Sequence, residues 1–112
     1  MLLEKVSILY VEDDGEIREA LAETLEFDVK ELYVAENGEE GLKKFKEFKP
    51  DIVISDIKMP KMDGLQMSAQ IKEISPKTPI IITTAFSDSD YLLKAIDIGI
   101  DKYVTKPVDI DK

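Results

Sequence analysis

The sequence predicts an α/β protein built on a doubly wound parallel sheet of five strands. Short aliphatic runs of strand length alternate along the chain with segments whose apolar residues recur at helical spacing. Nearly continuous apolar runs are typical of strands that are buried on both faces of a parallel sheet. Single helices between such strands imply right-handed crossovers, so we expect helices on both faces of the sheet.

Five short segments have the composition of strands. Each is bounded by polar residues, and the fourth is β-branched throughout after its initial proline. The predicted strands span residues 6–11, 31–35, 51–56, 79–84 and 102–105.

Four helices are predicted between these strands, each with one apolar face. A residue type that favours helix N-caps stands before each helix. The expected caps are Asp14, Asn37, Asp63 and either Ser87 or Asp88. The apolar faces comprise, in chain order, Ile17, Leu21 and Leu25; Leu42, Phe45 and Phe48; Met67, Ile71 and Ile74; and Leu92, Ala95, Ile96 and Gly99.

The last residues predict the beginning of a fifth helix. Asp109, shortly after Pro107, is an expected helix cap, but only three residues follow it. One face of the sheet would then be under-covered. We therefore expect residues 1–112 to form one domain that continues, in the native chain, through the rest of this helix.

Composition limits the classes of function. A chain of 112 residues with 44% hydrophobic residues is expected to fold around one core. A net charge of −9 argues against direct binding of nucleic acid or an anionic membrane. The absence of cysteine and histidine excludes disulfides, thiolate chemistry and a phosphohistidine, and disfavours zinc. Neither a signal peptide nor a membrane span is evident, which predicts a cytoplasmic domain.

Charged side chains stand at the ends of three predicted strands. Glu12 and Asp13 follow the first strand, Asp56 ends the third, and Lys106 follows the fifth. Ligands of open α/β sheets gather beyond the carboxyl ends of the strands. If these strands are neighbours, several carboxylates and one ammonium meet at one edge. That combination predicts a site for a cation and a phosphoryl group.

Five motifs in order resemble those of the receiver domain of two-component response regulators, over about residues 5–112. The motifs are Val11–Asp14 with Ile17 and Arg18 behind them, Asp56–Gly64, Thr84 with Ala85, Gly99, and Tyr103–Pro107. The resemblance implies a flavodoxin-like three-layer sandwich with strand order 2-1-3-4-5. That fold agrees with the alternation of strands and helices.

The resemblance makes Asp56 the phosphoryl acceptor in a Mg²⁺ site. A carboxylate can attack phosphorus, and a bound cation offsets the repulsion between the two anions. The implied direct ligands are Asp13, Asp56 and the backbone carbonyl of Lys58, with Glu12 acting through a water. Many family members carry aspartate where this chain has Glu12.

The resemblance assigns further roles around the acceptor. Lys106 would pair with Asp56 and then with the phosphoryl oxygens, aimed inward by a cis Lys106–Pro107 bond. Thr84 would donate its hydroxyl to the same oxygens and, with Tyr103, act as a switch. This switch would change the face made by the fourth helix, fifth strand and fifth helix. Gly64 is interpreted as structural, because it allows a tight entry into the third helix.

The implied activity is signal reception by self-modification. The chain would take a phosphoryl group from a sensor histidine kinase or a histidine phosphotransfer protein within a phosphorelay, and later hydrolyse it. Its other expected partners are a downstream output domain or target protein, and a homodimer that forms on phosphorylation. The alternative is a receiver-like interaction module that works without phosphorylation. That reading requires loss of the acceptor, an acidic ligand or the lysine, and all are present.

Two other reactions are disfavoured by single positions. A phosphatase of the haloacid-dehalogenase type needs an aspartate two residues after its nucleophile, where this chain has Lys58. A flavodoxin cradles phosphate in a loop of hydroxyls and glycines after its first strand. Here Glu12, Asp13 and Asp14 would repel that phosphate.

Overall fold

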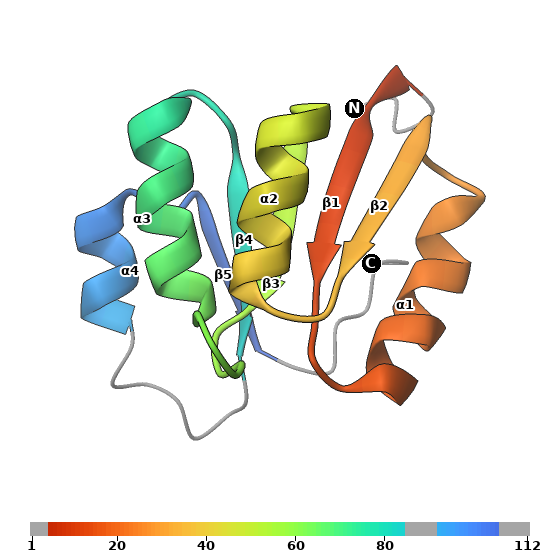
Figure 1. Cartoon of the computed structure of the whole chain (residues 1–112), viewed down its shortest axis with the longest axis horizontal. Helices are drawn as coiled ribbons and strands as arrows, with labels where there is room; N and C mark the ends of the chain where they lie inside the picture. Colours follow the sequence, from red (N-terminus) through yellow and green to blue (C-terminus); the bar gives the residue numbers. More distant parts are fainter. Residues whose placement is uncertain (1–4, 85–91, 106–112) are drawn as a thin grey trace.

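Five parallel strands form one sheet in the order β2-β1-β3-β4-β5, as predicted (Figure 1). The computed structural model describes residues 5–84 and 92–105. The strands are β1 (Ser7–Val11), β2 (Glu31–Ala35), β3 (Ile52–Asp56), β4 (Ile80–Thr84) and β5 (Lys102–Thr105). The helices are α1 (Gly15–Glu26), α2 (Gly38–Phe48), α3 (Gly64–Ile74) and α4 (Leu92–Ile98).

The helices of the described chain lie on both faces of the sheet, with α2, α3 and α4 on one face and α1 on the other (Figure 1). Alternate residues of β1 therefore enter different cores. Leu9 and Val11 pack with α2 and α3, whereas Ile8 and Tyr10 pack with Leu25 of α1. Among the described helices, none is long and apolar enough to cross a membrane.

Local sequence signals placed the element boundaries well. The second and fifth strands have the predicted limits, and the other three begin one residue later than predicted. Three predicted caps are confirmed, because Asp14, Asn37 and Asp63 each accept a hydrogen bond from a backbone N–H in the first turn of their helix. The expected caps Ser87, Asp88 and Asp109 lie outside the described residues.

The predicted apolar face of α4 is partly wrong. Ala95 is buried, but Ile96 is 62% exposed and the side of Gly99 where a Cβ would stand is open. Ile98, three residues after Ala95, packs against the core instead. Successive residues of a helix are separated by about 100° around its axis, so Ile96 points away from the side on which Ala95 is buried.

Gly99 has a different task, which is to end α4. Its φ of +92° favours glycine, and its N–H donates to the carbonyl of Ile96 at 3.1 Å. The next N–H, of Ile100, donates to the carbonyl of Ala95 at 3.1 Å. This pair of bonds is a Schellman motif.

An ion pair at the amino edge of the sheet positions β5. Lys72 of α3 lies 2.9 Å from Asp101, which also accepts a hydrogen bond from the Ile80 N–H at 2.8 Å. Burial alone would raise the pKa of the Asp101 carboxyl, but these two contacts together lower that pKa below its usual range. The loop before β5 is thereby held against the start of β4.

The end of α2 generates a stability prediction. Lys49 has left-handed backbone angles (φ 46°, ψ 60°), which cost an L-residue about 1–2 kcal/mol. Lys49→Gly removes that cost but adds the chain entropy of glycine, so we expect a net gain of about 0.5–1 kcal/mol. Urea unfolding measures the change.

Lys43→Gly is the matched control, because it removes the same charge from an exposed position inside α2. Lys43 lies inside a helix and has no left-handed backbone strain that glycine could remove, so the free energy of unfolding should fall by about 1 kcal/mol. Equal losses from both substitutions would contradict the strain at Lys49.

Candidate functional site

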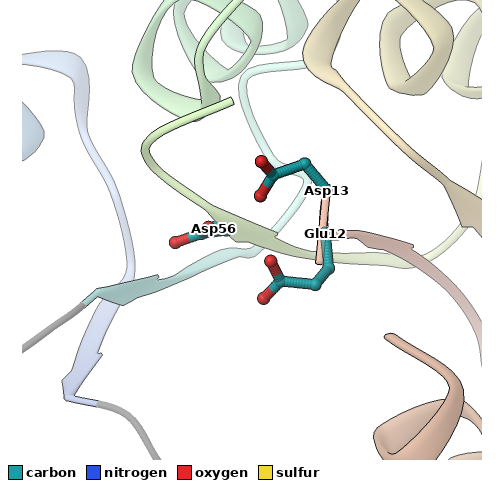
Figure 2. A group of neighbouring side chains, drawn as sticks. All are labelled: Glu12, Asp13 and Asp56. Atoms are coloured by element: carbon teal, nitrogen blue, oxygen red, sulfur yellow. The ribbon is translucent and has the colours of Figure 1, made fainter. Parts of the chain in front are cut away.

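Three carboxylates meet where β1 and β3 end. Glu12 follows β1, Asp13 comes next, and Asp56 is the last residue of β3. Val11 pairs with Ser55 in the parallel ladder, so the next residues, Glu12 and Asp56, lie side by side at the carboxyl edge of the sheet. Figure 2 shows the three carboxylates directed to the same side of the strand ends.

The three side chains fit a small hard cation. One carboxylate oxygen from each of Glu12, Asp13 and Asp56 lies within 4.8 Å of the other two. At such distances each pair of charges repels by roughly 1–3 kcal/mol, depending on solvent exposure. A divalent cation would relieve this repulsion, and carboxylate oxygens are donors that Mg²⁺ prefers. The donor set therefore suits the predicted metal.

Burial differs among the three carboxylates. Glu12 is 1% exposed and Asp56 is 7% exposed, whereas Asp13 is exposed to solvent. The Ile57 N–H donates to Asp56 Oδ1 at 2.9 Å, and the Asp14 N–H donates to Glu12 Oε2 at 3.2 Å. The two buried carboxylates are thus oriented by backbone donors, and Asp13 faces solvent at the mouth of the site.

The negative field of the site extends into the sheet. Burial raises the pKa of the Tyr10 hydroxyl above its usual range, and the nearby charges of Glu12 and Asp56 raise it further. Arg18 acts in the opposite direction. Tyr10 is buried on the α1 side of the sheet. It therefore stays protonated and serves as part of the core.

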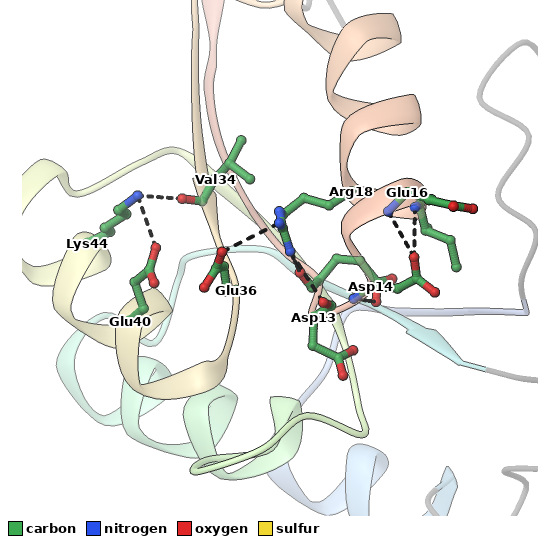
Figure 3. Close-up of polar contacts among 10 residues, drawn as sticks. Asp13, Asp14, Glu16, Arg18, Val34, Glu36, Glu40 and Lys44 are labelled. Atoms are coloured by element: carbon green, nitrogen blue, oxygen red, sulfur yellow. Dashed lines mark hydrogen bonds and ion pairs between the residues drawn. The ribbon is translucent and has the colours of Figure 1, made fainter.

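Arg18, on α1, connects the loop after β1 to the loop after β2. Its Nη1 donates to the carbonyl of Glu12 at 2.8 Å and approaches the carbonyl of Asp13 at 3.4 Å. Its Nη2 lies 3.5 Å from Glu36 Oε1 (Figure 3). The sequence placed Arg18 in a motif but gave it no role. One sequence signal could have indicated this role. Arg18 is a cation in the first turns of the helix that follows the acidic end of the first strand.

Close backbone contacts shape the loop between β3 and α3. The Gly64 N–H donates to the carbonyl of Ile57 at 2.8 Å, which folds the loop back onto the end of β3. Within the loop, the Met62 N–H donates to the carbonyl of Pro60 at 2.8 Å, with Lys61 between them at φ 68°. This three-residue turn is a strained γ-turn.

The two glycines at this edge are needed for close packing, which the sequence indicated for only one of them. A Cβ on Gly64 would lie 2.0 Å from the carbonyl oxygen of Asp56, and one on Gly38 would lie 2.3 Å from that of Met62. The predicted structural role of Gly64 is consistent with this contact. The role of Gly38 depends on a distant loop, so no local signal marked it.

The structure brings some of the other predicted residues to the same edge. Thr84 ends β4 and is 2% exposed, and its neighbour Thr83 pairs with Asp56 across the ladder. Tyr103 pairs with Ile82 and packs partly buried against the core. Lys58 lies in the loop after Asp56 with its side chain exposed. Lys106 and Pro107, and with them the predicted cis bond, lie outside the described residues, as does Ala85.

Comparison with known proteins gives a family. A model described as "Response regulator receiver domain" matches residues 8–112. The chain is 38% identical over 100 residues to the chemotaxis protein CheY of Halobacterium salinarum, covering 89% of this chain and 83% of that protein. It is 42% identical over 102 residues to the DNA-binding transcriptional regulator NtrC of Escherichia coli, covering 91% of this chain and 22% of that protein.

The chain thus spans about a quarter of the length of several regulators it matches. It is also similar to a solved receiver domain protein from Clostridium thermocellum, with a TM-score of 0.87 at 36% identity, covering 94% of this chain and 85% of that chain. A chain of the CheX–CheY–BeF3–Mg complex from Borrelia burgdorferi gives a TM-score of 0.81 at 27% identity, with coverages of 93% and 80%.

The contact between Gly64 and Asp56 generates a prediction. Gly64→Ala places a methyl group 2.0 Å from a backbone oxygen, so β3 or the loop must shift. We expect the free energy of unfolding to fall by about 2–3 kcal/mol. Urea unfolding measures the loss, and the amide chemical shifts of Asp56 and Ile57 report the displacement.

Gly15→Ala serves as the control at the other acidic loop. A Cβ there would meet its nearest atom, Arg18 Nη2, at an ordinary 3.6 Å. Since alanine favours helices, stability should stay unchanged or rise by up to about 1 kcal/mol. A loss at Gly64 no larger than the change at Gly15 would show that the contact is not restrictive.

Proposed function

The chain belongs to the response regulator receiver family, and on that basis we propose that Asp56 accepts a phosphoryl group from a histidine kinase or a histidine phosphotransfer protein. The observation that carries the proposal is the position of Asp56, which is buried among the strand ends beside two further carboxylates. A nucleophile held in this way can receive a phosphoryl group, while water has limited access to it.

The transfer is a displacement at phosphorus. One oxygen of the Asp56 carboxylate forms a bond to phosphorus while the P–N bond of the donor phosphohistidine breaks. The electron pair leaves with the imidazole nitrogen, which takes a proton from solvent. Hydrolysis of the aspartyl phosphate later releases inorganic phosphate and restores the carboxylate. The hydrogen bond from the Ile57 N–H to Oδ1 fixes the plane in which Asp56 attacks.

Asp13 and Asp56 are the proposed direct ligands of Mg²⁺, together with the carbonyl of Lys58, and Glu12 would act through a water. When bound, the metal supplies positive charge that offsets the repulsion between carboxylate and phosphoryl oxygens. Asp13 is exposed, so it would bind the metal on the side from which the phosphoryl donor approaches. Glu12 is buried, and it would hold a water ligand of the metal from the protein side. The solved CheX–CheY relative contains BeF3 and Mg²⁺, which supports this choice of metal.

Signalling is proposed to involve Thr84 and Tyr103. The Thr84 hydroxyl, at the buried end of β4, would donate to the new phosphoryl oxygens, and Lys106 would pair with them. The half-buried ring of Tyr103 would then move further inward, altering the face formed by α4, β5 and the residues after β5. A BeF3-activated receiver domain among the structural relatives supports a phosphorylation-dependent state.

We propose the partners of the whole protein from the descriptions of its relatives. Some relatives are described as DNA-binding regulators and others as chemotaxis proteins. We propose that this domain controls an output domain or a separate target protein in the cytoplasm. The control would act directly or through a homodimer formed on phosphorylation, and the domain itself would not contact DNA.

The acceptor is tested by intact mass after incubation with acetyl phosphate and Mg²⁺. We expect a single phosphoryl adduct in the wild type, loss of the adduct when EDTA replaces Mg²⁺, and no adduct in Asp56→Asn. Asp28→Asn removes the same charge at an exposed position after α1 and should be phosphorylated like the wild type.

Two results would contradict the proposal. An adduct that persists in Asp56→Asn would place the phosphoryl group on another residue. Lack of any adduct on the folded wild type, with acetyl phosphate and with a kinase extract, would favour the interaction module that works without phosphorylation.

A further inference from the structure

We infer that Arg18 is a positioning residue of the cation site, which sets the direction of the Asp13 carboxylate by holding the peptide groups on both sides of it. The inference deepens the proposed function and rests on it. In the proposed reaction, Arg18 contacts neither the Asp56 carboxylate nor the phosphoryl group. It acts through the backbone of the loop after β1, as its contacts show.

The contacts of Arg18 surround Asp13. The carbonyl of Glu12 belongs to the peptide group before Asp13, and the carbonyl of Asp13 belongs to the one after it. Nη1 of Arg18 reaches both, at 2.8 Å and 3.4 Å (Figure 3). Holding both peptide planes fixes the backbone angles of Asp13 and therefore the direction of its Cα–Cβ bond. An exposed side chain such as Asp13 gains its orientation in this way without packing around it.

The ion pair with Glu36 is the weaker part of the arrangement. Its N–O distance is 3.5 Å, and the Glu36 side chain is 65% exposed, whereas that of Arg18 is 18% exposed. Exposed ion pairs contribute little because water screens them. The short bond to the carbonyl of Glu12 is shielded better, so this bond should dominate the positioning.

Arginine suits this place better than lysine does. A planar guanidinium presents several N–H donors at fixed angles, so one side chain can hold two carbonyls and a carboxylate together. A lysine ammonium carries the same charge, but it sits on a flexible stem and lacks the rigid planar group that holds Nη1 of Arg18 against both carbonyls. Arg18→Lys therefore separates the geometry of the donors from the charge.

Positioning and charge predict opposite effects on cation binding. Arg18 is a positive charge close enough to the acidic site to influence Tyr10 beside it. If only that charge mattered, its removal would strengthen Mg²⁺ binding, because a competing cation would be gone. If positioning dominates, removal weakens binding, because Asp13 loses its fixed direction.

The test measures the dissociation constant of Mg²⁺ by following the amide chemical shifts of Asp13 and Asp56 in the full chain. We expect both Arg18→Lys and Arg18→Met to bind Mg²⁺ about tenfold more weakly than the wild type, the scale typical of residues that orient metal ligands. Glu36→Gln should stay within about twofold, because its ion pair is exposed.

A stability control separates positioning from general loosening of the fold. Val29→Ala removes apolar volume from the core beneath α1, away from the three carboxylates. It should lower the urea midpoint while leaving the Mg²⁺ dissociation constant unchanged. An Arg18 variant with a similar urea midpoint but weaker Mg²⁺ binding would then establish the positioning role.

Other outcomes overturn the inference in distinguishable ways. Wild-type affinity in Arg18→Lys would show that the donor fork is not needed. Tighter binding in Arg18→Met would show that Arg18 acts as a competing charge. If the wild type shows no Mg²⁺-dependent shifts at Asp13 and Asp56, the proposed metal site fails, and the role of Arg18 fails with it.

Discussion

Val11 and Ser55 pair in the parallel ladder of β1 and β3, and this register places Glu12 and Asp56 side by side at the carboxyl edge of the sheet. Alternate side chains of a strand face opposite sides, so a slip of one residue would exchange the two cores and separate the carboxylates. Leu9 and Val53 on one face, and Ile8 and Ile52 on the other, hold the register by burial. Hydrophobic packing thus supports a group of mutually repelling charges.

The site is completed by loops that contact one another through their backbones. Arg18 joins the loop after β1 to Glu36 after β2, and the Gly38 N–H joins the loop after β2 to the carbonyl of Met62 after β3. Gly64 then brings the start of α3 against the backbone of Asp56. Three loops from separate parts of the chain therefore form one connected edge.

The opposite edge of the sheet, where the strands begin, carries lysines in place of a group of carboxylates. A cavity of about 570 Å³ lies there between the ends of α2 and α3, lined in part by Lys46, Lys49 and Lys77. Lysines near helix C-termini offset the partial negative charge of the last carbonyls, which is reason enough for their position. Asp51, an acid that lines this cavity, accepts a hydrogen bond from the Ser7 N–H at 2.8 Å. The charged groups at this edge therefore serve the fold, whereas the three neighbouring carboxylates lie at the carboxyl edge.

Sequence alone determined the features that depend on neighbouring residues. The strand and helix alternation follows from apolar spacing, the caps Asp14, Asn37 and Asp63 from side chains that satisfy nearby N–H groups, and the gathering of acids from the rule that parallel strands end together. Tertiary structure decided what depends on distant partners. In α4, Ala95 and Ile98 pack against the core and Ile96 does not. The spacing of apolar residues along a helix could not predict this, because it does not specify where the neighbouring elements lie. The tasks of Arg18 and Gly38 likewise arise from contacts with other loops, which only the folded chain brings within reach.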